Sequence, residues 1–201
     1  DQAGMPILNP IEMNIPNEQF LVERLSNIKL YQNLFTKAFP KATSPISFTN
    51  IKTAIGAFER TLVTPSRFDE FVQGNNNALT NKEKQGLALF VKTGCTSCHN
   101  GKLLGASSYQ KFGVTANYWD YTNSKKRDKG RFAVTGNQGD SYVFKVPSLR
   151  NVNETYPYFH DGSVEKLSDA VWIMARVQLD KDLSEEDVDL IVKFIDPTLK
   201  I

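Results

Sequence analysis

The residues best suited to chemistry are two cysteines and a histidine within five positions, Cys95-Thr96-Ser97-Cys98-His99. The two thiols are spaced so that each can add to one vinyl group of a single haem, and the histidine that follows can bind the iron. The chain holds only two cysteines and two histidines in 201 residues, so chance is a weak explanation of this order. We therefore expect one covalently attached haem c, with Cys95 and Cys98 as attachment residues and His99 as an iron ligand.

Two other kinds of site also use a C-x-x-C pair. A thioredoxin-like redox pair follows a strand and opens a helix. Here the segment 80–83 matches a capping box and an apolar face follows at Leu87, Phe90 and Val91, so the cysteines come at the end of a helix. A zinc site needs two further ligands, and the sequence offers only one other histidine, His160, and no third cysteine. Haem attachment is therefore the favoured interpretation.

A haem that transfers electrons commonly has a second axial ligand, for which Met174 and His160 are the candidates. Met174 lies on the apolar face of a helix predicted over 165–179, where a methionine either packs in the core or binds iron. His160 lies in the aromatic loop 156–162, where it binds iron, tunes the haem through a neighbouring group or has a structural role. The spacing in the sequence does not separate these roles.

Helical periodicity dominates the rest of the chain. Prolines at positions 6, 10 and 16 break the first segment, which we expect to be mostly loop. Apolar residues recur every three or four positions over 17–39 and 49–62, and again over 163–179 and 184–195, which predicts amphipathic helices. Strand signals are few, and 100–158 has no sustained period. We therefore expect a mostly α protein.

The polar segment 74–77 is the predicted domain boundary, which divides the chain into 1–75 and 76–201. Twenty-four Lys and Arg residues against 22 Asp and Glu give a formal net charge of +2, which is too small for a phosphate-binding surface or a polybasic membrane anchor. No run approaches 18 apolar residues. We expect neither nucleic acid nor a membrane as a partner.

Several segments together resemble the bacterial di-haem cytochrome c peroxidase family. They span nearly the whole chain in the family's order: NPIEM at 9–13, the C-x-x-C-H run with Asn100-Gly101, DKGRF at 128–132, FKVPSLRNV at 144–152, YFHDG at 158–162 and the helix that carries Met174. The resemblance implies a class I cytochrome c-like helical domain around one covalent haem over 76–201. It also implies that 1–75 is the helical remainder of a second, peroxidatic domain, whose N-terminal haem-binding segment is missing from this sequence.

The resemblance assigns roles at the electron-transfer haem. His99 would be its proximal iron ligand and Met174 its distal ligand. From its place in the aromatic loop, we also expect His160 among the cofactor-binding residues. In this family a threonine side chain and a proline carbonyl just before the aromatic loop bind a calcium ion, and Thr155 and Pro157 occupy those places. Calcium prefers such oxygen ligands.

Two further residues are implied at the other haem, where hydrogen peroxide is reduced. Gln2 and Glu12 match the glutamine and the glutamate that line the peroxide pocket, and Glu12 would shuttle protons during O–O cleavage. Because the chain contains a single C-x-x-C-H run, a second haem is expected only in the full protein, and we expect this chain alone to transfer electrons without peroxidase turnover.

The resemblance thus implies that the protein is an oxidoreductase, namely a cytochrome c peroxidase of the periplasm. It also implies that the protein can form a homodimer. A small cytochrome c or copper protein would donate electrons, which pass to the peroxidatic haem. The chain starts at Asp1 with neither a charged nor an apolar leader, so we expect an export signal to have been removed already. The alternatives are a stand-alone mono-haem electron carrier and a haem-based sensor or enzyme whose iron has an open position, with Met174 in the core.

Overall fold

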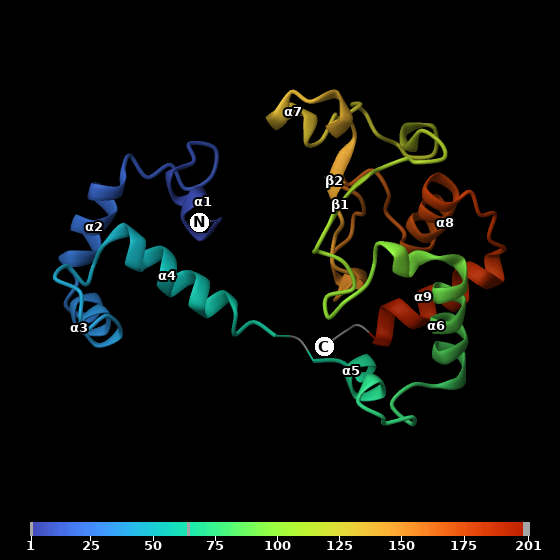
Figure 1. Cartoon of the computed structure of the whole chain (residues 1–201), viewed down its shortest axis with the longest axis horizontal. Coiled ribbons are helices and arrows are strands. Elements are labelled where there is room, and N and C mark those ends of the chain that lie inside the picture. Colours follow the sequence, from blue (N-terminus) through green and yellow to red (C-terminus); the bar gives the residue numbers. More distant parts are fainter. Residues whose placement is uncertain (1, 64, 199–201) are drawn as a thin grey trace. The chain divides into compact units, whose positions relative to one another are not determined.

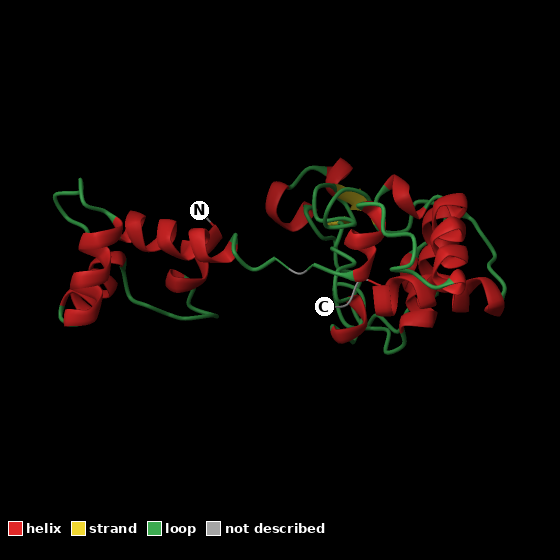
Figure 2. Cartoon of the chain, turned by 90° about the horizontal axis from the view of Figure 1, so that it is seen from below, coloured by secondary structure: helices red, strands yellow, loops and turns green. Residues whose placement is uncertain are grey.

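The computed structural model describes residues 2–63 and 65–198 of the chain. The chain forms two compact units, Asp1–Val63 and Thr64–Ile201, and each is described by itself (Figure 1). Helices make up most of the regular structure in both units, and the only sheet in the described ranges is a pair of short strands in the second (Figure 2). The expectation of a mostly α protein is confirmed.

The first unit is helical, and its three longer helices follow the predicted periodicity. Its elements are a 3-10 turn at Gln2–Gly4 and the α-helices α1 (Met5–Leu8), α2 (Glu18–Ser26), α3 (Lys29–Ala38) and α4 (Phe48–Glu59). The side chain of Asn17 accepts a hydrogen bond from the backbone N–H of Phe20, which caps the start of α2. The apolar side chains meet in a small core of Ile7, Phe35, Phe48 and Ile51. Before Pro16 the expected loop begins only after Leu8, because the 3-10 turn and α1 together run without a break from Gln2 to Leu8.

The second unit packs three long helices around one core. Its elements are α5 (Arg67–Val72), α6 (Asn81–Thr93), α7 (Phe132–Thr135), α8 (Leu167–Leu179), α9 (Glu185–Thr198), the antiparallel strands β1 (Tyr109–Lys111) and β2 (Val143–Lys145), and 3-10 turns at Cys95–Ser97, Tyr118–Asp120, Gln138–Asp140 and Val152–Glu154. The largest fully buried side chains of the described part of this unit are Tyr118, Phe194, Ile191 and Val177.

Helices α6 and α9 lie side by side in this unit, as Figure 1 shows. Gly86 allows their close approach, because a Cβ atom at that position would come within 2.0 Å of the Leu190 carbonyl oxygen. On the same two helices, the rings of Phe90 and Phe194 pack edge to face with centroids 5.6 Å apart. The contact fixes the direction of α6 and therefore where its C-terminal end delivers the cysteines.

The capping box predicted for α6 is present. The Glu83 N–H donates to Thr80 Oγ1 at 3.3 Å, and Thr80 N–H donates to Glu83 Oε2 at 2.7 Å. Gly94 ends the helix in the left-handed conformation, with φ of 101°. The attachment motif thus begins one residue beyond a helix whose two ends are both fixed by local sequence.

The boundary between the units lies before α5, so the expectation of a boundary at 74–77 is wrong. Two ion pairs tie α5 to the second unit: Arg67 Nη2 lies 2.6 Å from Glu83 Oε1, and Arg150 Nη2 lies 2.6 Å from Asp69 Oδ1. These partners are 16 and 81 residues apart in sequence, so the polar run 74–77 is a turn within the unit rather than a linker.

The stretch 100–158 is irregular, as expected, with only single-turn helices and the strands β1 and β2. Helix α8 begins at Leu167, four residues later than predicted from position 163. The intervening residues are extended because the N–H of Tyr158 bonds to the Val164 carbonyl at 2.6 Å in an isolated antiparallel bridge. No helix in the described ranges has the length and apolar character that crossing a membrane requires.

Candidate haem-binding cavity

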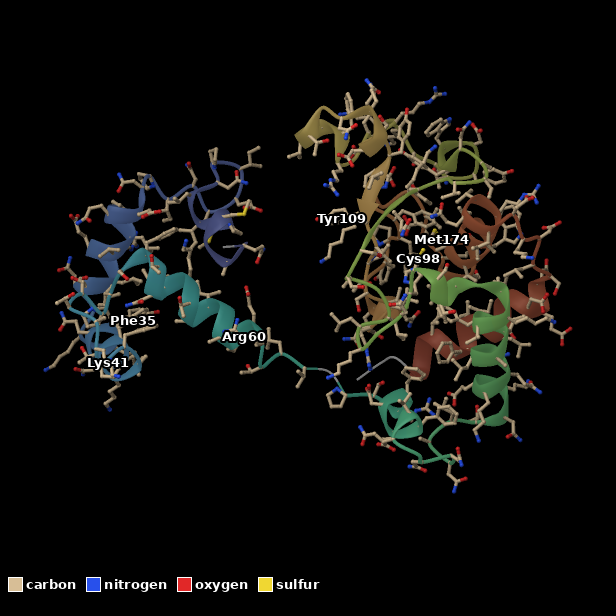
Figure 3. The ribbon with its side chains drawn as sticks, viewed as in Figure 1. Phe35, Lys41, Arg60, Cys98, Tyr109 and Met174 are labelled. Carbon is tan, nitrogen blue, oxygen red and sulfur yellow. The ribbon has the colours of Figure 1, made fainter. Side chains whose placement is uncertain are left out.

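A cavity of about 380 Å³ occupies the centre of the second unit and falls within the range usual for small-molecule sites. Figure 3 labels Cys98, from the turn after α6, and Met174, from α8, near its middle. Both line the cavity, together with Cys95 and His99. Much of the remaining wall is aliphatic and aromatic, contributed by Phe90, Phe112, Phe144, Val146, Leu149, Tyr158, Phe159, Leu167, Val171, Leu179, Leu183, Ile191 and Ile195.

The motif itself folds into a tight 3-10 turn. The N–H groups of Cys98 and His99 both donate to the Cys95 carbonyl, at 3.3 and 2.9 Å, and both cysteines are free thiols. The turn brings both thiols and the imidazole of His99 to the same cavity. Burial raises the pKa of the Cys95 thiol to about 11. A thioredoxin-type nucleophile needs a lowered pKa, so Cys95 does not have that character.

His99 is oriented by a backbone carbonyl. Its Nδ1 atom lies 3.1 Å from the Leu104 carbonyl oxygen. A carbonyl oxygen only accepts, so Nδ1 carries the proton and Nε2 keeps its lone pair, the arrangement of an imidazole ready to bind a metal. Burial lowers the pKa of His99, with partial compensation from the carbonyls of Leu104 and Pro147, and this keeps the ring neutral.

Gly105 lets the loop after the motif pass directly under His99. It has a φ of 129°, and a Cβ atom there would come within 2.1 Å of the Pro147 carbonyl oxygen and 3.3 Å of His99 Nδ1. A side chain at this position would therefore both strain the backbone and push the loop away from the imidazole. Of the segment that faces this loop, Pro147, Ser148 and Leu149 line the cavity.

Met174 and His160 both line the cavity. Met174 projects from α8, and its neighbours Ile173 and Ala175 are buried. The His160 ring stacks on Phe144 with centroids 4.1 Å apart, and meets the edges of Phe112 and Tyr118 at 6.1 and 5.5 Å. The structure thus brings both candidate ligands to the site, and the choice between them stays a prediction.

Thr155 and Pro157, the residues expected at a calcium ion, also line this cavity and are exposed. Thr155 Oγ1 donates to the Val152 carbonyl at 3.1 Å, which leaves its lone pairs available. Calcium takes six to eight oxygen ligands, and within 2–63 and 65–198 no cluster of three or more His, Cys, Asp or Glu side chains could hold a metal ion. These two residues alone do not complete a calcium site.

Gln2 and Glu12 belong to the first unit, in the 3-10 turn before α1 and in the turn after it. Both side chains are largely exposed. The turn that carries Glu12 is closed by backbone hydrogen bonds from Glu12 N–H to the Asn9 carbonyl and from Met13 N–H to the Pro6 carbonyl, at 3.1 and 3.2 Å. The turn therefore presents the carboxylate on the surface of this unit, and its predicted role at a peroxide stays a prediction.

The donor set fits haem c and fits the alternatives poorly. Two thiols, one imidazole with a free Nε2 and one thioether line a single apolar cavity, and these are the groups that attach and ligate a c-type haem. In the part of the chain that the structure describes, no group of three or more His, Cys, Asp or Glu side chains is arranged to hold a metal ion, which argues against zinc.

Three contributors to the site were not predicted from the sequence. The Leu104 carbonyl and Gly105 act through the backbone, which residue types in a sequence do not reveal. Gln178 lines the cavity and binds loop 111–114 through its amide, which accepts from Gly113 N–H at 2.6 Å and donates to the Lys111 carbonyl at 3.0 Å. The only signal for Gln178 was its place four residues after Met174 on one helix.

Comparisons with known proteins agree with this geometry. The family described as di-haem cytochrome c peroxidase matches residues 1–77. The cytochrome c551 peroxidase of Pseudomonas aeruginosa is 47% identical over 97% of this chain and 56% of its own length. The cytochrome c551 peroxidase of Nitrosomonas europaea is 44% identical over 97% of this chain and 57% of its own length.

A solved structure extends the match to three dimensions. The crystal structure of a MauG-like protein associated with microbial copper homeostasis superimposes with a TM-score of 0.77 at 27% identity, over 98% of this chain and 68% of that one. This likeness agrees with the expected cytochrome c-like helical fold. The chain spans little more than half the length of the two cytochrome c551 peroxidases. From its similarity to them over nearly all of its own length, the chain belongs to the di-haem cytochrome c peroxidase family.

Proposed function

We propose that the chain is the haem c electron-transfer part of a cytochrome c peroxidase. The single observation that carries the proposal is the donor set in one apolar cavity, with two thiols, a neutral imidazole oriented by Leu104 and a thioether. A haem iron held by such ligands exchanges one electron between its ferrous and ferric states. The two relatives named cytochrome c551 peroxidase support the same reaction class.

Cys95 and Cys98 hold the cofactor. Each thiol would attach the haem by adding its S–H across one vinyl C=C bond, so that the hydrogen ends on the other vinyl carbon and no group is lost. The short turn between the cysteines sets the distance between the two bonds. The apolar wall excludes water from the cofactor, and a dry surrounding is one of the levers by which a protein sets a haem potential.

We propose that His99 and Met174 would be the protein ligands of the haem iron. The bond from His99 Nδ1–H to the Leu104 carbonyl leaves Nε2 for iron, and the Met174 thioether lines the same cavity from α8. We favour Met174 over His160 because the His160 ring is stacked face to face on Phe144. In this assignment His160 packs beside the cofactor and shapes its surroundings.

The peroxidatic part of the function is assigned to the first unit and to a further haem outside this sequence. The family's description specifies two haems, and the chain has one C-x-x-C-H run. Gln2 and Glu12 would line the pocket of the other haem. There the Glu12 carboxylate would accept a proton from hydrogen peroxide and return it as two electrons and two protons reduce the peroxide to two waters.

The remaining assignments follow from this role. The electron donor is a small cytochrome c or copper protein, the protein works in the periplasm, and a homodimer is the proposed assembly. Calcium at Thr155 and Pro157 would need further oxygen ligands from water or from outside this chain. Fractionation of cells that produce the protein tests the compartment, and loss of bound calcium in a Thr155→Val variant tests the metal site.

The proposed function is tested with the matured chain and with a polypeptide extended to the length of the relatives. The extended protein is expected to oxidise a reduced small cytochrome with hydrogen peroxide, at two donor molecules per peroxide. The chain alone is expected to accept electrons from that donor without consuming peroxide. The Glu12→Gln variant of the extended protein should keep both haems and lose turnover. Full turnover by E12Q, or an extended protein with both haems and no peroxidase activity, contradicts the proposal.

A further inference from the structure

Three consecutive carbonyl groups in the loop after the attachment motif are each held by one residue of the segment 148–150. The Lys102 carbonyl accepts from the Arg150 guanidinium, the Leu103 carbonyl accepts from Ser148 Oγ at 2.7 Å, and the Leu104 carbonyl accepts from Leu149 N–H at 3.3 Å. The last of these is the carbonyl that orients His99. The segment 148–150 therefore holds the loop whose Leu104 carbonyl orients the His99 imidazole.

Of the three residues in this segment, Arg150 makes the most side-chain hydrogen bonds. Its Nε and Nη2 atoms both donate to the Lys102 carbonyl, at 3.1 and 2.8 Å. On its other side the guanidinium binds Asp69 in a bidentate pair, with both N···O distances at 2.6 Å, and Nη1 also donates to Ser66 Oγ at 2.9 Å. Five hydrogen bonds fix a side chain that is only 11% exposed.

Asp69, the partner of Arg150, is itself held in place. Asp69 is the third residue of α5, and its carboxylate also closes the capping box of that helix by accepting from Ser66 N–H at 2.7 Å. The Arg150 bond holds the pKa of Asp69 at about 2, so the carboxylate is charged under all ordinary conditions. Arg150 thus joins the start of α5 to the loop after His99, and it makes none of its bonds to the cofactor ligands.

We propose that Arg150, anchored by Asp69, is a positioning residue for His99 and thereby sets the reduction potential of the haem. This inference rests on the proposed ligation of iron by His99. The path has three steps: Arg150 fixes the Lys102 carbonyl, the short loop 102–104 carries that constraint to Leu104, and the Leu104 carbonyl accepts from His99 Nδ1. A firm bond at Nδ1 makes the imidazole a more basic ligand, which favours ferric iron.

A second arginine provides a matched control. Arg67 is the first residue of α5, and like Arg150 it binds a carboxylate. It donates to Glu83 at 3.1 and 2.6 Å and to the Ala78 carbonyl at 3.0 Å. These three bonds all lie within 67–83, outside the loop after His99. Removing either arginine should cost stability, because each leaves a carboxylate without its partner. Only removal of Arg150 should change the haem.

The test compares Arg150→Gln and Arg67→Gln in the haem-loaded chain by spectroelectrochemical titration and by urea denaturation. Both variants are expected to unfold at lower urea. R150Q alone is expected to raise the ferrous-to-ferric ratio at a fixed ambient potential by about threefold or more, because a looser Nδ1 bond weakens the ligand. Proton NMR of the ferric form should show a displaced His99 ring signal in R150Q and not in R67Q. Equal potentials in R150Q, R67Q and the parent chain overturn the proposal.

Two milder variants cover the case in which R150Q does not mature. Arg150→Lys keeps a positive partner for Asp69 but loses the paired bonds to Lys102, and Asp69→Asn keeps those bonds but loosens their anchor. Each should shift the potential in the same direction by a smaller amount, and an unchanged potential in both contradicts a positioning role. If instead the parent chain carries no covalent haem, the proposed function fails and not this inference alone.

Discussion

The Nδ1 atom of His99 lies 3.1 Å from the carbonyl oxygen of Leu104, five residues further along the chain. The bond closes the loop that follows the attachment motif and commits the ring to one tautomer. It explains why the haem motif needs more than its five residues, since the sequence up to Gly105 and the facing segment 147–150 together determine how the imidazole is presented.

Replacing Met174 by leucine separates packing from iron binding. Leucine keeps the volume, so the expected loss of stability from packing alone is below about 1.5 kcal/mol. Without the thioether the iron has an open position, and the ferrous M174L protein should bind carbon monoxide rapidly whereas the parent chain should not. The His160→Asn variant is the control and should behave as the parent. Rapid binding by H160N with none by M174L would exchange the roles of the two residues.

Substitution of Gly105 by alanine should disturb the site itself. The new Cβ would come within 2.1 Å of the Pro147 carbonyl oxygen at a φ of 129°, so we expect a loss of about 3 kcal/mol or more and poor haem incorporation. Gly136→Ala is the matched control, because Gly136 also has a positive φ, 66°, but nothing within 4 Å of a Cβ. Its cost should stay near about 1 kcal/mol. Urea denaturation and the ratio of haem absorbance to protein check both values.

The pair of Asp69 with Arg150 should make stability depend on pH in the acid range. The pKa of Asp69 is about 2 in the folded chain against 3.8 for the unperturbed group. A lowered folded pKa stabilises the fold above pH 3.8, and this contribution is lost as the pH falls toward 2. With allowance for screening at a carboxylate that is 30% exposed, we expect about 1 to 2 kcal/mol.

The same prediction can be checked with one substitution. The free energy of unfolding should fall between pH 7 and pH 2.5 in both proteins. The fall should be smaller by about 1 kcal/mol in D69N than in the parent chain, because the variant has no carboxylate to protonate at this position. The Asp182→Asn variant, at an exposed residue between α8 and α9, serves as the control. An equal acid sensitivity of D69N and the parent would show that this pair does not contribute.

Gln178 should matter through its amide rather than its size. It accepts from Gly113 N–H at 2.6 Å and Val114 N–H at 3.2 Å, and donates to the Lys111 carbonyl at 3.0 Å. Gln178→Ala should cost about 1 to 3 kcal/mol, because it removes the partners of these backbone groups. Gln85→Ala on the exposed face of α6 should stay within about 0.5 kcal/mol. Equal urea midpoints for the two variants would refute this role for the amide.

The helices could be predicted because their signals are local. Periodicity located α2, α3, α4, α6, α8 and α9, and the capping box at Thr80 and Glu83 located the start of α6 to the residue. The unit boundary could not be predicted, since α5 is assigned to its unit by ion pairs with partners 16 and 81 positions away. A polar, glycine-containing run has the same appearance whether it links domains or turns within one.

For the site too, local features could be predicted from the sequence and distant contacts could not. Covalent attachment needs its two thiols and imidazole adjacent in the chain, so sequence alone was enough to propose it. The elements that orient them are distant or belong to the backbone: the Leu104 carbonyl has no signature in residue type, and Arg150 was visible only as one letter of a family motif. Met174 and His160 both line the cavity, so neither periodicity nor the fold by itself decides which one binds iron.

The central claim is that Cys95 and Cys98 carry one haem through covalent bonds. Intact mass spectrometry of the denatured protein, produced in cells that can mature c-type cytochromes, tests it most directly. We predict the 22.6 kDa chain plus the mass of one haem, retained under conditions that remove any haem held only by ligation, and the bare chain mass for a variant with Cys95→Ala and Cys98→Ala. A parent protein with the bare chain mass would contradict the account.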